Sequence, residues 1–158
     1  MYEISHFIVR FAAPADLPAM LALYAHLNPD DQKAQETKAE TAWDALLSSS
    51  LVKVFVAEMD GAIVSSCTIV IVPNVTRGVR PYALIENVVT HGDYRGRGLG
   101  HAVLAAALDA AWERDCYKVM LATGSPRPET FRFYEGAGFV RGGKTFFEAR
   151  PAAKTSQV

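Results

Sequence analysis

The stretch that decides the fold is Arg95-Gly96-Arg97-Gly98-Leu99-Gly100, which joins a strand-like segment, 83–90, to a helix-like segment, 99–114. Its three alternate glycines have no side chains, so their backbone N–H groups can turn toward one ligand. The helix that follows adds the unpaired N–H groups and the positive dipole end of its first turn. Such a corner binds anions, and Arg95 and Arg97 add positive charge. The pattern predicts a phosphorylated ligand where the strand meets the helix.

Two other phosphate-binding patterns do not fit this loop. A P-loop requires G-x-x-x-x-G-K-[ST], and the chain contains no such string. A dinucleotide fingerprint requires G-x-G-x-x-G, but His101 or Val103 stands where the third glycine belongs. The strand before the loop also comes late in the chain, whereas the fingerprint follows the first strand of its domain. A nucleotide-dependent oxidoreductase is therefore disfavoured.

Hydrophobic periodicity and turn residues divide the whole chain into strands and helices. The predicted strands are 6–12, 52–58, 62–72, 82–90 and 117–123, with a final strand or hairpin at 139–149. The predicted helices are one that starts within 14–18 and stops at Asn28, and then 32–47, 99–114 and 129–135.

This order predicts one α/β (α+β) domain around a central, mixed, mostly antiparallel sheet. The segment 82–123 reads as a β-α-β unit whose two strands pair in parallel. We expect the domain to cover residues 1–150, with 151–158 as a flexible tail.

Composition and charge are those of an ordinary globular protein. Half of the residues are hydrophobic and the net charge is −1, so nothing favours nucleic acid or a membrane surface as partner. Residues 1–79 carry a net charge of −4 and residues 80–158 one of +3, which places the glycine loop in the basic half. We find no signal-peptide pattern, and no apolar run reaches the roughly 18–20 residues that cross a bilayer.

The chain has two cysteines, Cys67 and Cys116, with no C-x-x-C pair and no histidine cluster. A disulfide framework or a zinc site is therefore not expected. The sequence predicts a reduced, cytoplasmic protein without a metal cofactor.

The loop fits the pattern [QR]-x-x-G-x-[GA] after an apolar strand, filled by Arg95, Gly98 and Gly100. The segment 87–94 looks like the strand and turn that precede such a loop, and 133–139 reads Phe-Tyr-Glu-Gly-Ala-Gly-Phe. With these motifs, and with the order of elements across nearly the whole chain, the sequence resembles the GNAT superfamily of acyl-CoA-dependent N-acetyltransferases. The resemblance implies transfer of an acetyl group from acetyl-CoA to a primary amine of a small molecule or peptide, by direct attack.

The resemblance also implies how the co-substrate binds. In this family the pyrophosphate of CoA rests on the loop, and the pantetheine amides pair with a strand edge, here 88–90. That strand usually carries a bulge and splays from the next parallel strand, here 117–123, so that a backbone donor can polarise the thioester carbonyl. The cofactor-binding residues implied are Val88, Val89, Thr90, Arg95, Gly96, Arg97, Gly98, Leu99, Gly100 and His101.

Two side chains are candidates for proton transfer. The family places a tyrosine beside the sulfur, here Tyr134, whose phenol is protonated at neutral pH and can serve as the acid; the alternative is an aromatic packed in the core. Glu86 lies in an otherwise apolar strand. It is a candidate base, a candidate anchor for the substrate ammonium, or a structural residue. Strand alternation puts Glu86 on one face with Leu84 and Val88, unless a bulge intervenes.

The segments 84–89, 93–96 and 116–119 are similar to those of glucosamine 6-phosphate N-acetyltransferases. The chain differs from that subgroup at Ala122, where Asp or Glu is usual, and in a longer segment at 123–129. The sugar phosphate is therefore not assigned from the sequence, and neither is the acyl-chain preference.

Acceptor specificity is expected from the more variable parts of the chain, 20–47 and 73–81. A non-catalytic acyl-CoA binding or sensor module is the alternative function. A homodimer is expected only by analogy, because dimers are common among similar proteins.

Overall fold

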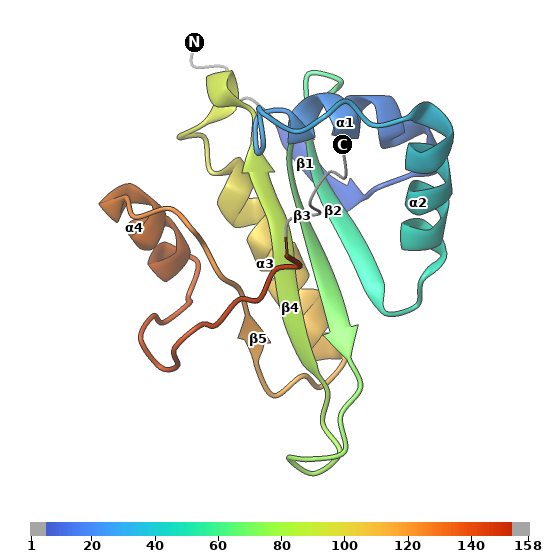
Figure 1. Cartoon of the computed structure of the whole chain (residues 1–158). Coiled ribbons are helices and arrows are strands. Elements are labelled where there is room, and N and C mark those ends of the chain that lie inside the picture. Colours follow the sequence, from blue (N-terminus) through green and yellow to red (C-terminus); the bar gives the residue numbers. More distant parts are fainter. Residues whose placement is uncertain (1–5, 153–158) are drawn as a thin grey trace. The chain divides into compact units, whose positions relative to one another are not determined.

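A five-stranded sheet with the order β1-β2-β3-β4-β5 forms the centre of the first of two compact units, residues 1–123 and 124–158 (Figure 1). The computed structural model describes residues 6–152. β1 to β4 pair antiparallel and β4 pairs with β5 in parallel, as predicted. The strands are β1 Phe7–Phe11, β2 Val52–Met59, β3 Ala62–Val72, β4 Tyr82–Thr90 and β5 Val119–Met120.

Among residues 6–152, three α-helices belong to this unit and one to the second. They are α1 Leu17–Tyr24, α2 Glu36–Ser48, α3 Leu99–Glu113 and, in the second unit, α4 Pro128–Gly136. Two short 3-10 turns, Pro14–Asp16 and Gly92–Tyr94, precede α1 and follow β4. None of the helices in the described part of the chain has both the length and the apolar composition to cross a bilayer.

The β2–β3 hairpin follows from its turn residues. Asp60 and Gly61 take φ values of 52° and 77°. A two-residue turn with both φ values positive matches the twist of the strands that it joins. The predicted Asp-Gly hairpin is confirmed.

The two faces of the sheet carry different helices. Val54 and Val56 of β2 are buried in a cluster with side chains of α1 and α2. Their cross-strand partners on β3 are Thr68 and Ser66. Cys67 lies between these two residues, and its thiol donates to the Val103 carbonyl of α3 at 3.3 Å. Because neighbouring residues of a strand point to opposite faces, α1 and α2 cover one face and α3 covers the other.

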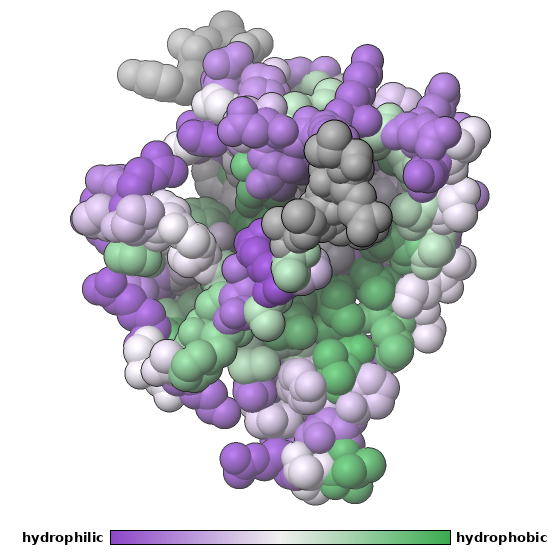
Figure 2. Space-filling model, in the orientation of Figure 1, coloured by the Kyte–Doolittle hydropathy of each residue, from purple (hydrophilic) through white to green (hydrophobic). Residues whose placement is uncertain are grey.

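The face under α1 and α2 is only partly covered. Figure 2 shows hydrophobic residues at the surface over β2 and β3 beside α2. Val70 and Leu84, which are cross-strand partners, are both partly exposed. Apolar sheet surface thus lies next to the helices that were expected to set acceptor specificity.

Two predicted strands differ from the structure. β5 covers two residues instead of 117–123, although the bond from Tyr117 N to Pro81 O (2.9 Å) extends its contact with the start of β4. The prediction of a strand at 139–149 is wrong, because no strand occurs among residues 124–152. That unit therefore has no strand to pair with, and Gly138 and Gly142 take φ values of 94° and 84°, which a regular strand does not accommodate. Residues 153–158 of the predicted tail lie outside the described residues.

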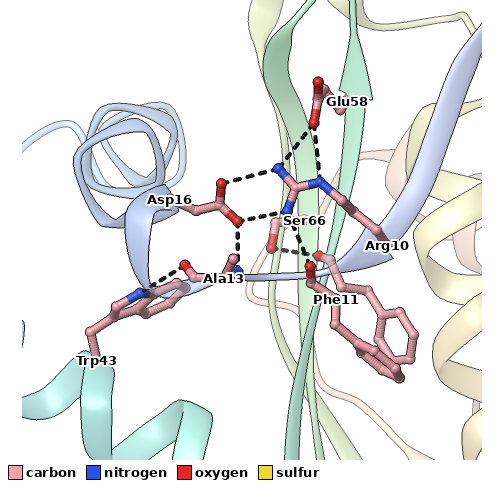
Figure 3. A network of polar contacts seen from close by, with 8 residues as sticks. Arg10, Phe11, Ala13, Asp16, Trp43, Glu58 and Ser66 are labelled. Carbon is pink, nitrogen blue, oxygen red and sulfur yellow. Dashed lines mark hydrogen bonds and ion pairs between the residues drawn. The ribbon is translucent and has the colours of Figure 1, made fainter.

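An ion-pair network connects β1 to the start of α1 (Figure 3). The Arg10 guanidinium donates to Asp16 at 2.7 and 3.0 Å and to Glu58 of β2 at 3.0 Å. Asp16 also accepts from the Ala13 amide at 2.7 Å, and the Ala13 carbonyl accepts from the Trp43 indole at 3.3 Å. The hydrogen bond from Arg10 holds the pKa of Asp16 below its ordinary value. The network thereby connects β1 and β2 to the turn before α1, and the Trp43 indole connects α2 to the same turn.

Asp16→Asn tests this network. A lowered folded-state pKa stabilises the protein above the ordinary pKa of Asp, and this stabilisation is lost as the pH falls through the folded-state pKa. We expect the variant to lose about 1–3 kcal/mol of unfolding free energy at pH 7 and much less at pH 3, in urea titrations at both values. Glu58→Gln, a more exposed partner of the same guanidinium, should cost less at pH 7. An equal loss for Asp16→Asn at both pH values would contradict the assignment.

Candidate active site

The corner between β4 and α3 leaves its backbone open. Gly96 and Gly98 take φ values of 75° and 80°, which other residues rarely adopt. A Cβ atom at either position would meet nothing within 4 Å. Gly98 is also the N-cap of α3 and has no side chain to cap the helix. The loop backbone is thus free of side-chain obstruction at Gly96 and Gly98, and its role as a phosphate cradle stays a prediction.

The start of α3 is anchored under this corner. Leu99 and Gly100 are buried, and their N–H groups lie in the first turn, where a helix offers no acceptor of its own. His101 follows on the same turn and its side chain is exposed. The positive end of the α3 dipole therefore lies at this corner.

The two arginines of the loop are exposed and held close to it. Arg95 Nε lies 3.5 Å from the Thr90 carbonyl. Arg97 donates to the Asp93 carbonyl at 3.3 Å and stacks over the Tyr94 ring at 5.0 Å. Neither guanidinium is paired with a carboxylate among the described residues. Both charges are therefore available to an anion bound at the corner.

β4 carries the bulge that the family resemblance implied. Ser66 pairs with Val89 and Thr68 pairs with Glu86, so two β4 residues oppose one residue of β3. Within the bulge, Asn87 takes a φ of 53°. An extra residue of this kind bends the strand and increases its twist.

The bulge changes which side chains share a face. Val89 is buried in the core cluster under α1 and α2, on the same face of the sheet as Glu86. Val88 is only half-buried. Simple alternation would place Val88 on one face with Leu84 and Glu86 unless a bulge intervened; the bulge is present, and its extra residue reverses the alternation beyond Asn87. The side chains of Val88 and Val89 still flank the backbone proposed for pantetheine.

β4 and β5 separate soon after they meet. Their ladder consists of Ala83–Val119 and Leu84–Met120. Among residues 6–152, no strand pairs with 85–90 on that side. The β4 edge at Val88, Val89 and Thr90 can therefore receive an extended, amide-bearing ligand as an added strand.

Glu86 lies on β4 between the end of this ladder and the bulge. Its side chain is exposed, and it makes no hydrogen bond or ion pair with the other described residues. These observations disfavour a structural ion pair. They agree equally with a base and with an ammonium anchor.

Tyr134 belongs to α4 in the second unit. It is half-buried, with the Phe133 ring at 5.0 Å and the Phe139 ring at 6.3 Å. The aromatic packing that was the alternative to an acid therefore exists within this unit. The role of Tyr134 as an acid stays a prediction.

The sequence did not indicate a contact between two histidines beside the corner. The rings of His26 and His91 lie 4.0 Å apart, and His91 Nδ1 accepts from the Asp93 amide at 3.2 Å. His91 thus stabilises the turn that follows β4. Nothing local in the sequence pairs His26 with His91, because the contact is made by the packing of α1 on the sheet.

The cysteines do not form a catalytic nucleophile. Both are free and buried, and burial raises the pKa of Cys67 to about 12. A thiol of that pKa is protonated at neutral pH. In the described part of the chain, no group of three or more His, Cys, Asp or Glu side chains is placed to hold a metal ion; the expectation of no metal cofactor stays a prediction.

Comparison with known proteins agrees with this geometry. Residues 20–139 match the model of the acetyltransferase (GNAT) family. The chain is 32% identical over 139 residues, 88% of its length and 92% of the relative's, to glucosamine 6-phosphate N-acetyltransferase of Trypanosoma brucei brucei. A putative acetyltransferase from Agrobacterium tumefaciens str. C58 superposes with a TM-score of 0.87 at 45% identity, over 91% of this chain and 99% of that one.

A more distant solved structure shares the fold. Glucosamine-6-phosphate N-acetyltransferase from Arabidopsis thaliana superposes with a TM-score of 0.81 at 22% identity, over 94% of this chain and 99% of that one. The bulged strand, the glycine corner and the family match lead to the same conclusion. The chain belongs to the acetyltransferase (GNAT) family and is an acetyl-CoA-dependent N-acetyltransferase.

Proposed function

We propose that the chain acetylates the primary amine of a small molecule. The amine nitrogen attacks the thioester carbonyl of acetyl-CoA and the carbon–sulfur bond breaks. Glu86 takes the proton released by the amine, directly or through water, and Tyr134 protonates the departing thiolate. The observation that carries the proposal is the open, bulged edge of β4, with an exposed and unpaired carboxylate beside it.

We assign the co-substrate to the corner and the strand edge. The pyrophosphate binds the backbone of 95–100 and the first turn of α3, including His101, and the pantetheine arm pairs with 88–90. The positive φ values of Gly96 and Gly98 and the open space before them support this assignment. A donor of the bulge then polarises the thioester carbonyl, which is the main contribution of such a site together with positioning.

An amino-sugar phosphate is the first acceptor to test. The relative from Trypanosoma brucei brucei is named as a glucosamine 6-phosphate N-acetyltransferase, and it aligns with 88% of this chain. The departures at Ala122 and 123–129 are the reason to test other amines beside it. A polyamine, an amino acid and a peptide amine complete the panel.

The organisation and location of the enzyme are also proposals. The family match covers residues 20–139 and crosses the boundary between the two units, which supports one catalytic domain over 1–150. Two buried, free cysteines agree with a cytoplasmic location. A homodimer, and the absence of nucleic-acid and membrane partners, stay predictions from the sequence.

The amine panel tests the proposal against a non-catalytic acyl-CoA sensor. With acetyl-CoA and each amine in turn, release of the free thiol of CoA is followed with a chromogenic thiol reagent. Thiol release that depends on both the amine and the protein supports the enzyme. Tight binding of CoA in calorimetry, with no turnover of any amine, would instead support the sensor.

Gly98→Val tests the corner. The new side chain strains a backbone with positive φ, and its bulk fills the space in front of the first turn of α3. We expect CoA to bind at least about 10-fold more weakly in calorimetry, which is about 1.4 kcal/mol. Gly61→Val is a matched control, because Gly61 has a similar φ and the same open surroundings in the β2–β3 turn; it should lower the melting temperature but leave CoA affinity unchanged. Wild-type affinity in Gly98→Val would exclude the corner as the phosphate site.

Glu86→Gln separates the two roles that remain for this residue. A base predicts that kcat falls about 10²–10⁴-fold with little change in KM for the amine. An anchor for the substrate ammonium predicts that KM rises while kcat is largely retained. Steady-state kinetics at saturating acetyl-CoA distinguish these results, with Glu86→Asp as a variant that keeps the carboxylate. Wild-type values of both constants would remove Glu86 from the site.

Tyr134→Phe tests the acid. Loss of a proton donor to the leaving thiolate should lower kcat more than it raises KM, because the interaction forms in the transition state. Tyr82→Phe is the control, since this phenol lies at the start of β4, packed near Tyr117. Steady-state rates of thiol release provide the measurement. Equal activity of both variants and the wild type would leave Tyr134 with a packing role alone.

A further inference from the structure

A buried hydroxyl lies one strand away from Glu86. Thr68 of β3 is the direct cross-strand partner of Glu86, so their Cβ atoms lie about 4.5–5.5 Å apart on the same face. The Thr68 residue is 6% exposed. Its Oγ1 atom has no partner that meets hydrogen-bond geometry among the described residues. A buried hydroxyl without a partner costs about 1–3 kcal/mol, so its presence calls for an explanation.

The phenol of Tyr24 lies near Thr68 and belongs to α1, which covers this face of the sheet. Tyr24 is the last residue of α1 and packs half-buried against the core cluster of this face. Burial raises the pKa of Tyr24, and an interaction of its hydroxyl with the Thr68 hydroxyl offsets part of that rise, so the two hydroxyls lie near each other without meeting hydrogen-bond geometry. The Tyr24 hydroxyl of α1 thus lies beside Thr68, which is the cross-strand partner of Glu86.

The position of this group on the sheet is the second observation. The ladder between β4 and β5 ends at Leu84, and the bulge begins at Asn87. Glu86 is therefore the outermost member of the row formed by Val54, Thr68 and Glu86. The row runs from the core under α1 and α2 to the strand edge where the thioester is expected.

We propose that Thr68 is a positioning residue for the acceptor. When the amine binds, the Thr68 hydroxyl donates to the Glu86 carboxylate and holds it toward the amine nitrogen. The Tyr24 hydroxyl, beside it, binds a polar group next to the amine, as an amino sugar carries. This inference rests on the proposed function and names two further residues of the acceptor site, on the helix and the strand that lie opposite Glu86.

Thr68→Val tests the inference, because valine has nearly the same shape and lacks the hydroxyl. We expect kcat/KM for the amine to fall about 10-fold, as for loss of a hydrogen bond to a charged group, with KM for acetyl-CoA unchanged. The melting temperature should change little, because the Thr68 hydroxyl has no partner at hydrogen-bond geometry and loses only its interaction with Tyr24. Thr68→Ser keeps the hydroxyl and should retain most of the activity.

Ser66→Ala is the matched control on the same strand and face. The Ser66 hydroxyl already donates to the Phe55 carbonyl at 2.8 Å, so its loss should lower the melting temperature and leave amine kinetics unchanged. The probe is whichever of glucosamine 6-phosphate, spermidine, alanine and a peptide with a free N-terminus the wild type acetylates fastest. A double-mutant cycle of Thr68→Val with Glu86→Gln should be strongly non-additive, because the first residue acts through the second.

Two results would overturn the inference. One is wild-type kcat/KM in Thr68→Val, and the other is additive losses in the cycle. Either result, with an active wild type, leaves the proposed function intact. If the wild type acetylates none of the four amines, the proposed function is contradicted, and this inference, which rests on it, is contradicted as well.

Discussion

The unequal pairing of the two edges of β4 is the constraint on which the site depends. On one edge β4 pairs with β3 along its length, interrupted by the bulge at Asn87. On the other edge it pairs with β5 over two residues. A strand held firmly from one side can present its other edge to a ligand without losing its own position. The backbone groups proposed to bind pantetheine are thereby positioned by the pairing of β4 with β3.

The rest of the first unit keeps that strand in place. α3 buries Leu99, Val103, Leu104, Ala107 and Ala111, which secures the helix start beneath the glycine corner. α1 and α2 cover the opposite face, and the network of Arg10 with Asp16 and Glu58 orients their entry to the sheet. Binding of phosphate through main-chain N–H groups requires such support, because the donors cannot adjust as side chains do.

The chemistry of the site is divided between backbone and side chains. In the proposed binding mode, the corner and the β4 edge offer main-chain donors to the parts of acetyl-CoA that do not react. Glu86 lies on the face that bears α1 and α2, where the amine is expected. The proposed assignment therefore gives co-substrate binding and acceptor selection to different elements of the fold.

Local patterns in the sequence determined the β2–β3 hairpin, the extent of β3 and β4, and the glycine corner before α3. Each of these depends on neighbouring residues, such as the Asp60-Gly61 turn or the alternate glycines at 96, 98 and 100, so a short stretch contains the information. The strand at 139–149 and the length of β5 were predicted wrongly, because a strand exists only where a partner pairs with it. The bulge was foreseen through the family resemblance, but its effect on the faces of Val88 and Val89 required the register with β3. Only the tertiary structure placed Thr68 opposite Glu86 and Tyr24 beside Thr68, since these positions depend on how α1 and two strands pack together.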